Sequence, residues 1–189
     1  MSGTFVVVSL GTYHLPFTRL VEWIEPWIAA NPAARVLVQH GPTRAATGAE
    51  NRRMVPYAEL LDHFRRADAV VLQGGAGGIQ DLRGLDRKPI VVPRVPGSGE
   101  VVDDHQLRFT QEAERLGLIH RALDAATLSA LLDAAVAGRL ETRLPATLEL
   151  PGADAVAGLL SEPPPPLPRS ERLRRLGRSA RGILGDLRR

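Results

Sequence analysis

Cysteine is absent from this sequence of 189 residues. That absence excludes disulfide bonds, thiolate nucleophiles and cysteine-ligated metals. No run of about eighteen apolar residues occurs, so we expect no membrane-spanning helix. The first residues, MSGTFVVVSLGT, lack the basic segment and the cleavage site of a secretory signal peptide. The lack of cysteine does not locate the protein, but the other two absences make a cytoplasmic protein the default expectation.

Positive charge does not predominate over most of the chain. The whole sequence carries a formal net charge of +3. Residues 169–189 hold eight arginines against Glu171 and Asp186, a net of +6, so residues 1–168 carry a net of −3. A mildly acidic body lacks the basic surface that nucleic-acid binding requires. We therefore expect no nucleic acid among the partners.

Apolar runs alternate regularly with helical patterns along most of the chain. Short runs of almost continuously apolar residues are typical of parallel strands that are buried on both faces. The sequence therefore predicts an α/β fold with a doubly wound, Rossmann-like parallel sheet. Trp23 and Trp27, four residues apart in the first helix, are expected to pack in the core. Strands are expected at 4–10, 35–39, 69–73 and 89–93, and helices at 16–30, 57–67, 77–85, 104–116, 127–138 and 152–162.

A proline-rich segment divides the chain near its C-terminal end. Four consecutive prolines at 163–166 form neither helix nor central strand and favour a stiff spacer. We expect a globular domain over 1–161, a linker over 162–168 and a basic tail over 169–189. As a helix the tail would carry apolar residues on one narrow face and arginines around it, a pattern typical of binding to an anionic membrane surface. Docking to a partner and a merely solubilising role are the alternatives.

Three loops with unusual residues follow predicted strands. In an open α/β sheet, ligands bind at the carboxyl ends of the strands. The first loop is SLGTYH at 9–14, the second is LQGGAGGIQDL at 72–82, and the third is GEVVDDHQ at 99–106. Glycines before a helix let backbone N–H groups approach an anion, although a tight strand–helix turn would have the same composition. The acidic pair in the third loop suits a helix N-cap, or a binding site for polar groups.

The ordered series of these segments resembles the nucleotide-sugar-binding half of the GT-B glycosyltransferases. The series comprises VVVSLGT, PFTRLVEWIE, VQHG, VPYAELLDHFRRADAVV, GGAGGIQDLR, KPIVVPR and GEVVDDHQLRF, within residues 4–120. It is similar to the C-terminal domain of glycosyltransferase family 28, and above all to its small stand-alone subunits. The resemblance implies a UDP-sugar donor, inversion at the anomeric carbon, and neither a metal nor another cofactor. It also implies a separate acceptor-binding subunit, anchored in a membrane, that supplies the general base for a lipid-linked acceptor.

The resemblance assigns the nucleotide to the first two loops and to the segment around Val55. Gly11 and Thr12 would face the donor diphosphate through backbone groups. Asp81 stands where the family has a glutamate that binds the ribose hydroxyls, and Val55 lies in the segment that faces the uracil. The glycine loop would wrap the phosphates through Gly75, Ala76 and Gly77.

The third loop would read the donor sugar. His105 and Gln106 stand where the family binds the sugar, with Asp104 beside them. The chain departs from the family pattern at Gln73, where a histidine is usual, and at Gly78, where a serine or threonine is usual. We interpret both departures as variation in the donor or the subfamily.

Some residues, and the function itself, have more than one interpretation from the sequence. His14 lies near the expected cleft and is a weak candidate for a catalytic or phosphate-binding role, with a surface histidine as the alternative. Arg94 and Glu100 precede the third loop and would pair with each other or shape the donor pocket. A non-catalytic nucleotide-sugar sensor and a sugar-nucleotide epimerase are the alternative functions. A homo-oligomer is the alternative to a separate partner, and a peripheral position at the inner membrane face is the alternative to a free cytoplasmic one.

Overall fold

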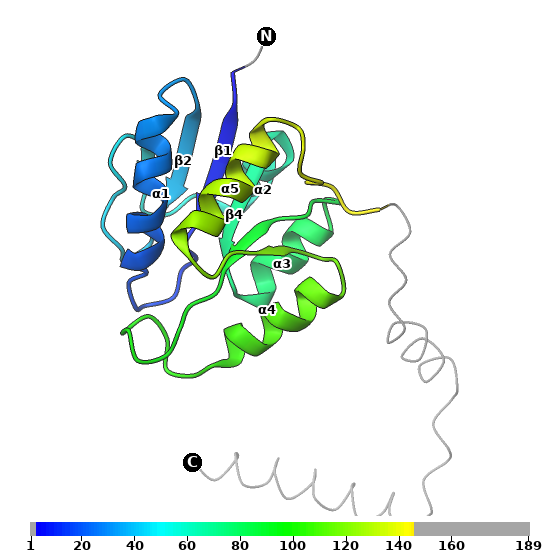
Figure 1. The fold of residues 1–189 in the computed structure, drawn as a ribbon. Coiled ribbons are helices and arrows are strands. Elements are labelled where there is room, and N and C mark those ends of the chain that lie inside the picture. The colour runs from blue at the N-terminus through cyan, green and yellow to red at the C-terminus, as the bar shows by residue number, and fades with distance from the viewer. Residues whose placement is uncertain (1–2, 146–189) are drawn as a thin grey trace, which may run out of the picture. The chain divides into compact units, whose positions relative to one another are not determined.

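Six parallel strands form one sheet in the order β3-β2-β1-β4-β5-β6 (Figure 1). The computed structural model describes residues 3–145. The order reverses direction between β1 and β4, which makes the fold a doubly wound, Rossmann-like α/β sheet, as the sequence predicted. The strands are β1 (Phe5–Ser9), β2 (Arg35–Gln39), β3 (Glu50–Arg52), β4 (Ala69–Gln73), β5 (Ile90–Val92) and β6 (His120–Arg121).

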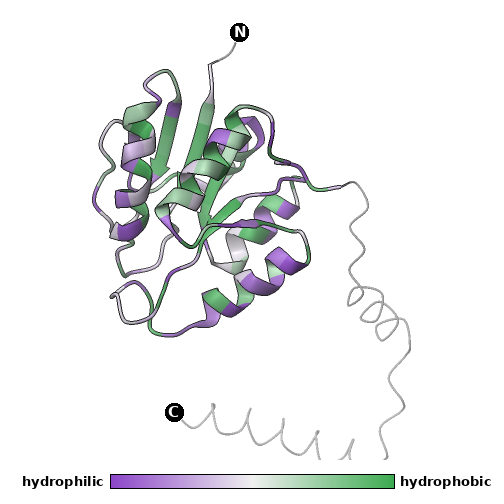
Figure 2. Ribbon diagram, in the orientation of Figure 1, coloured by the Kyte–Doolittle hydropathy of each residue, from purple (hydrophilic) through white to green (hydrophobic). Residues whose placement is uncertain are grey.

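Helices cover both faces of the sheet. Side chains alternate between the faces of a strand, so Val6 and Val8 of β1 enter one core while Phe5 and Val7 enter the other. The first core packs under α1 (Thr18–Ala30) and α5 (Ala125–Val136), and the second under α2 (Tyr57–Arg66), α3 (Ala76–Arg83) and α4 (His105–Arg115). Figure 2 shows the apolar strands and inner helix faces, with polar residues on the outer faces.

The boundaries differ from the predicted ones mainly at short elements. The sequence predicted no strand at β3, because this element is short and carries polar residues at one edge of the sheet. The helix predicted at 127–138 begins at Ala125 instead, because the Asp124 side chain accepts a hydrogen bond from the Thr127 backbone N at 2.7 Å. The expected helix at 152–162, the domain end at 161, the linker at 162–168 and the tail at 169–189 lie outside the described residues.

Packing of the two tryptophans follows the prediction. Trp27 is 3% exposed and lies in the first core, and the partly buried Trp23 packs against the same core. The Trp27 indole donates a hydrogen bond to the Asp133 carboxylate at 2.8 Å, which joins α1 to α5.

Within residues 3–145, no helix combines the length and the hydropathy needed to cross a bilayer.

The sheet sets the position of the three loops singled out in the sequence. Residues 10–17 follow β1, residues 74–75 follow β4, and residues 93–104 follow β5. Because all strands are parallel, the three segments lie together at the carboxyl ends of the strands. They are next to the switch point, where the strand order reverses between β1 and β4.

Candidate functional site

The glycine loop after β4 opens directly into α3. Gly75 is the N-cap and makes no side-chain capping bond, so the first N–H groups of α3 point outward without intrahelical partners. A Cβ atom on Gly75 would lie 2.5 Å from Nε2 of Gln73, whereas one on Gly77 would meet no atom within 4 Å. A side chain at position 75 would therefore displace the Gln73 amide. The glycine at position 77 leaves the start of the helix open to a ligand.

The loop after β1 also carries unpaired backbone donors. Among the described residues, the N–H groups from Gly11 to Leu15 find no hydrogen-bond acceptor. Gly11 has a φ of +77°, a conformation that side chains disfavour, and Thr12 and His14 are exposed. Such a run of open N–H groups is suited to binding an anion. The His14 ring lies 4.4 Å from that of Tyr13, centroid to centroid.

Gln73 lies where these two loops meet. Its side chain is within 2.9 Å of a Cβ placed on Gly11 and 2.5 Å of one placed on Gly75. Both glycines therefore make room for this one side chain. Within residues 3–145 the Gln73 amide makes no hydrogen bond, which leaves its donor and acceptor available at the switch point. Gln73, which stands where the family that the sequence resembles usually has a histidine, thus lies at the centre of the candidate site.

Of the two aspartates before α4, only Asp103 accepts a capping hydrogen bond from the helix backbone. Asp104 occupies the N-cap position, but its carboxylate accepts from Arg108 at 2.9 Å and not from the backbone. Asp103 does the capping, since its Oδ1 accepts from the His105 backbone N at 3.1 Å. The same oxygen lies 2.9 Å from Nδ1 of His105. These bonds lower the pKa of the Asp103 carboxyl. The His105 side chain itself is 85% exposed.

Gln106 is tied to both neighbouring loops. Its Oε1 accepts from the Arg94 backbone N at 3.1 Å. A Cβ on Gly74 would lie 2.9 Å from Cγ2 of Thr110 and 3.1 Å from the same oxygen, so glycine at position 74 makes room for both side chains. The amide nitrogen of Gln106 has no acceptor in the described part of the chain and is available to a ligand.

The segment expected to face the base is held by a buried glutamine. Val55 is only 7% exposed, and its backbone N donates to Oε1 of Gln39 at 3.1 Å. Nε2 of Gln39 donates in turn to the Ser9 hydroxyl at 3.2 Å. The large apolar side chains that this segment exposes are Met54 and Tyr57, at 57% and 61%.

Tyr57 also engages the carboxylate expected to bind ribose. Its hydroxyl donates to Oδ1 of Asp81 at 2.7 Å, which joins the start of α2 to α3. This bond raises the pKa of Tyr57 above its ordinary value. The sequence analysis missed Tyr57, although its place two residues after Val55 was an available signal. An exposed aromatic ring and a carboxylate thus lie side by side where a nucleoside is expected.

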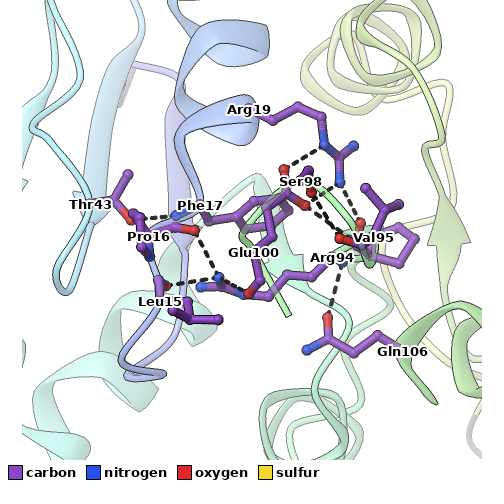
Figure 3. Close-up of polar contacts among 11 residues, drawn as sticks. Leu15, Pro16, Phe17, Arg19, Thr43, Arg94, Val95, Ser98, Glu100 and Gln106 are labelled. Atoms are coloured by element: carbon purple, nitrogen blue, oxygen red, sulfur yellow. Dashed lines mark hydrogen bonds and ion pairs between the residues drawn. The ribbon is translucent and has the colours of Figure 1, made fainter. Parts of the chain in front are cut away.

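Arg94 and Glu100 do not pair through their side chains, which was one of the two alternatives for them. The Glu100 carboxylate instead accepts two hydrogen bonds from Arg19, both at 2.8 Å. The Arg94 guanidinium is fully buried and contacts Glu100 only through its backbone carbonyl, at 2.9 Å. Figure 3 shows the two arginines reaching across the gap between the loops that follow β1 and β5.

The remaining histidines have local partners. Nδ1 of His40 lies 2.7 Å from the Thr43 carbonyl oxygen, and Nε2 of His120 lies 2.7 Å from that of Glu141. His63 is buried against Phe5, with its ring edge-on to the phenyl ring. No group of three or more His, Asp or Glu side chains that could hold a metal ion is found over residues 3–145. The absence of a metal from the reaction stays a prediction.

This chain is similar to known proteins in its structure and not in its sequence. No family model and no curated protein matches the sequence. The structure is similar to the glycosyltransferase of kitacinnamycin, with 24% identity and a TM-score of 0.52 over 82% of this chain and 38% of that one. It is similar to CalG4, the calicheamicin glycosyltransferase, with 16% identity and a TM-score of 0.50 over 84% of this chain and 44% of that one.

A third similar structure is much shorter. The solution structure of ALG13 matches with 18% identity and a TM-score of 0.52, over 81% of this chain and 94% of that one. The chain therefore spans less than half of the two larger glycosyltransferases and corresponds to nearly the whole of the ALG13 structure. At these identities the likeness establishes architecture: the chain has the Rossmann-like fold of one half of a GT-B glycosyltransferase.

Proposed function

We propose that this chain is the donor-binding subunit of a glycosyltransferase and that its donor is a UDP-sugar. One observation carries the proposal: two sets of unpaired backbone N–H groups lie on neighbouring segments at the switch point of the sheet, with the Gln73 side chain against both Gly11 and Gly75. They come from Gly11–Leu15 after β1 and from the start of α3 after β4. Oriented N–H groups and a helix N-terminus favour a diphosphate. The fold, which is that of one glycosyltransferase half, supports this reading.

The neighbouring side chains supply groups for the rest of the donor. Asp81 would accept from the ribose hydroxyls, which compete with Tyr57 for the carboxylate. The exposed Met54 and Tyr57 would border the base. The free amide nitrogen of Gln106 and the exposed imidazole of His105 would bind hydroxyls of the sugar.

The proposed chemistry is direct displacement at the anomeric carbon, with inversion. The acceptor oxygen forms a bond to that carbon while the bond to the UDP oxygen breaks. Negative charge then grows on the leaving diphosphate, where helix N-terminal N–H groups stabilise it without a metal. The acceptor's proton would pass to a base on a second lobe. Undiminished activity of the assembled enzyme in EDTA is the expected result, and loss that Mn²⁺ restores would refute the metal-free part.

Binding is tested first, on the full chain alone. Calorimetry with UDP and with several UDP-sugars should show binding, and ADP serves as the control for the base. No heat with any uridine nucleotide, on protein whose folding is verified by circular dichroism, would refute the proposal. A binding chain that transfers no sugar in the presence of its partner would instead be a nucleotide-sugar sensor.

We propose further that a separate subunit completes the active site. A GT-B reaction takes place between two lobes, and residues 3–145 form one. The partner would be membrane-anchored and bind a lipid-linked acceptor; a homo-oligomer is the alternative. Co-expression with the proteins encoded beside it should yield a co-purifying pair. A complex of two copies of this chain that is active by itself would favour the homo-oligomer.

The basic tail is proposed to hold the assembly at an anionic leaflet. Eight arginines in residues 169–189 would each contribute about 1 kcal/mol near such a surface. The full chain should sediment with vesicles that contain anionic lipid and be released by high salt, whereas a chain ending at Glu162 should stay in solution. Equal sedimentation of the two would exclude the tail from membrane binding.

A further inference from the structure

The loop with the unpaired N–H groups is held from outside by one buried arginine. The Arg94 guanidinium donates to the Leu10 carbonyl at 3.0 Å, at the start of the loop. It also donates to the carbonyls of Leu15 at 2.9 Å and Pro16 at 3.2 Å, at the end of the loop (Figure 3). The loop has few internal hydrogen bonds of its own, so these contacts fix both of its ends.

The same arginine reaches the segment that carries the sugar-binding side chains. Its guanidinium donates to the Glu100 carbonyl at 2.9 Å, and its backbone N donates to Oε1 of Gln106 at 3.1 Å. At the surface, Arg19 in the first turn of α1 donates to the Glu100 carboxylate and, at 2.8 Å, to the Pro93 carbonyl. Arg19 therefore adds a second connection between the same two segments, 10–19 and 93–106.

We infer that Arg94 is a positioning residue that holds the Gly11–Leu15 loop in the geometry that binds the donor diphosphate. The inference rests on the proposed function, because it deepens the account of the same site. Arg94 itself is fully buried, so its role would be to hold the loop rather than to contact the donor. It acts by fixing the carbonyls of the loop, so that the N–H groups of the loop face the ligand.

Arginine is suited to this role and lysine is not. A planar guanidinium presents several donors in a fixed fork, whereas an ammonium is a compact point charge on a flexible stem. Burial lowers the pKa of Arg94 below its ordinary value, and its contacts are neutral carbonyls, so the fold retains a costly charge here. An apolar residue would fill the space at less cost, but it would leave the carbonyls of three loop residues without donors.

The test compares UDP with uridine, which lacks the diphosphate. Arg94→Lys should weaken UDP binding about tenfold and leave uridine binding within about twofold, because only the diphosphate needs the ordered loop. Both affinities are measured by ligand-observed NMR and calorimetry on the full chain. In Arg94→Lys, backbone order parameters of residues 11–15 should also fall, which reports faster motion of the loop without any ligand.

Arg87→Lys is the matched control. Arg87 is 6% exposed, donates to the Ala67 carbonyl before β4, and has an Nε without a partner, as Arg94 does. It lies at the amino ends of the strands, away from the loop. Arg87→Lys should therefore lower stability while the ratio of the UDP and uridine affinities stays that of the wild type.

Each result decides one point. A wild-type ratio in folded Arg94→Lys would overturn the inference while leaving the proposed function intact. Failure of the wild-type chain to bind UDP would overturn both. If Arg94→Lys does not fold, Arg19→Gln replaces it, since Arg19 is partly exposed. It should weaken UDP about threefold and spare uridine, and an unchanged ratio there would equally overturn the inference.

Discussion

Replacing Gly77 by alanine should separate the stability of the fold from the binding of the ligand. Gly77 is the second residue of α3, and an added Cβ would meet no atom within 4 Å. Glycine costs a helix interior about 1 kcal/mol relative to alanine, and we expect about half of that in the first turn. Gly77→Ala should therefore unfold at the same urea concentration as the wild type or at a slightly higher one.

The same change should weaken UDP. A methyl group at the open start of α3 would keep a phosphate oxygen from the backbone N–H groups, and a hydrogen bond to a charged group contributes about 1.5–3 kcal/mol. Affinity should fall by a factor of about ten to one hundred, since each 1.4 kcal/mol corresponds to about tenfold. Calorimetry with UDP on the folded variant measures this loss.

Gly84→Ala is the control at the other end of the same helix. Gly84 has φ −63° and ψ −11°, which alanine adopts readily, and its Cβ would lie 3.4 Å from the Asp81 carbonyl. This variant should keep wild-type UDP affinity. Wild-type affinity in Gly77→Ala would refute the placement of the diphosphate at α3. A marked loss of stability would refute the reasoning from open space.

Three further expectations concern other side chains. Gln106→Ala should reduce selectivity among UDP-sugars more than UDP affinity, measured by competition; equal loss for both would refute a role at the sugar. In a Tyr13→Phe background, ultraviolet titration should show that Asp81→Asn lowers the pKa of Tyr57 toward its ordinary value, and UDP should do the same if ribose displaces the phenol. Arg44 lowers the pKa of Glu25 from 4.5 to about 2. That contribution to stability is complete above pH 4.5 and lost as pH falls toward 2, so Arg44→Gln should flatten the acid dependence of urea unfolding; an unchanged dependence would contradict it.

The sheet was largely predictable because its central strands are continuous apolar runs. The segments 35–39 and 69–73 became β2 and β4 with the predicted bounds. β3, with the sequence ENR, carries no apolar signal and becomes a strand only because β2 lies beside it. The apolar runs indicated parallel strands, and parallel strands place the loops together at their carboxyl ends. The position of the candidate site was therefore predictable.

The details of the site were less predictable, because they depend on which neighbour a side chain meets. Asp103 and Asp104 are chemically alike, and only the fold decides that Asp103 caps the helix while Asp104 binds Arg108. The partner of Glu100 is Arg19, 81 positions away, and no local pattern relates the two. Arg94 donates to backbone carbonyls, which every residue has, so the sequence cannot indicate these acceptors.

The strand order has a consequence for the folding of the chain. β1 pairs with β2 from the next part of the chain, but its other neighbour is β4, where Val6 pairs with Ala69. Arg94 lies 84 positions beyond Leu10, so at about 5–20 residues per second roughly ten seconds separate their synthesis. During that time the first loop exists without the arginine that holds it. On the proposed function, a nucleotide would therefore stabilise the finished domain and would not guide the early steps by which a nascent chain folds.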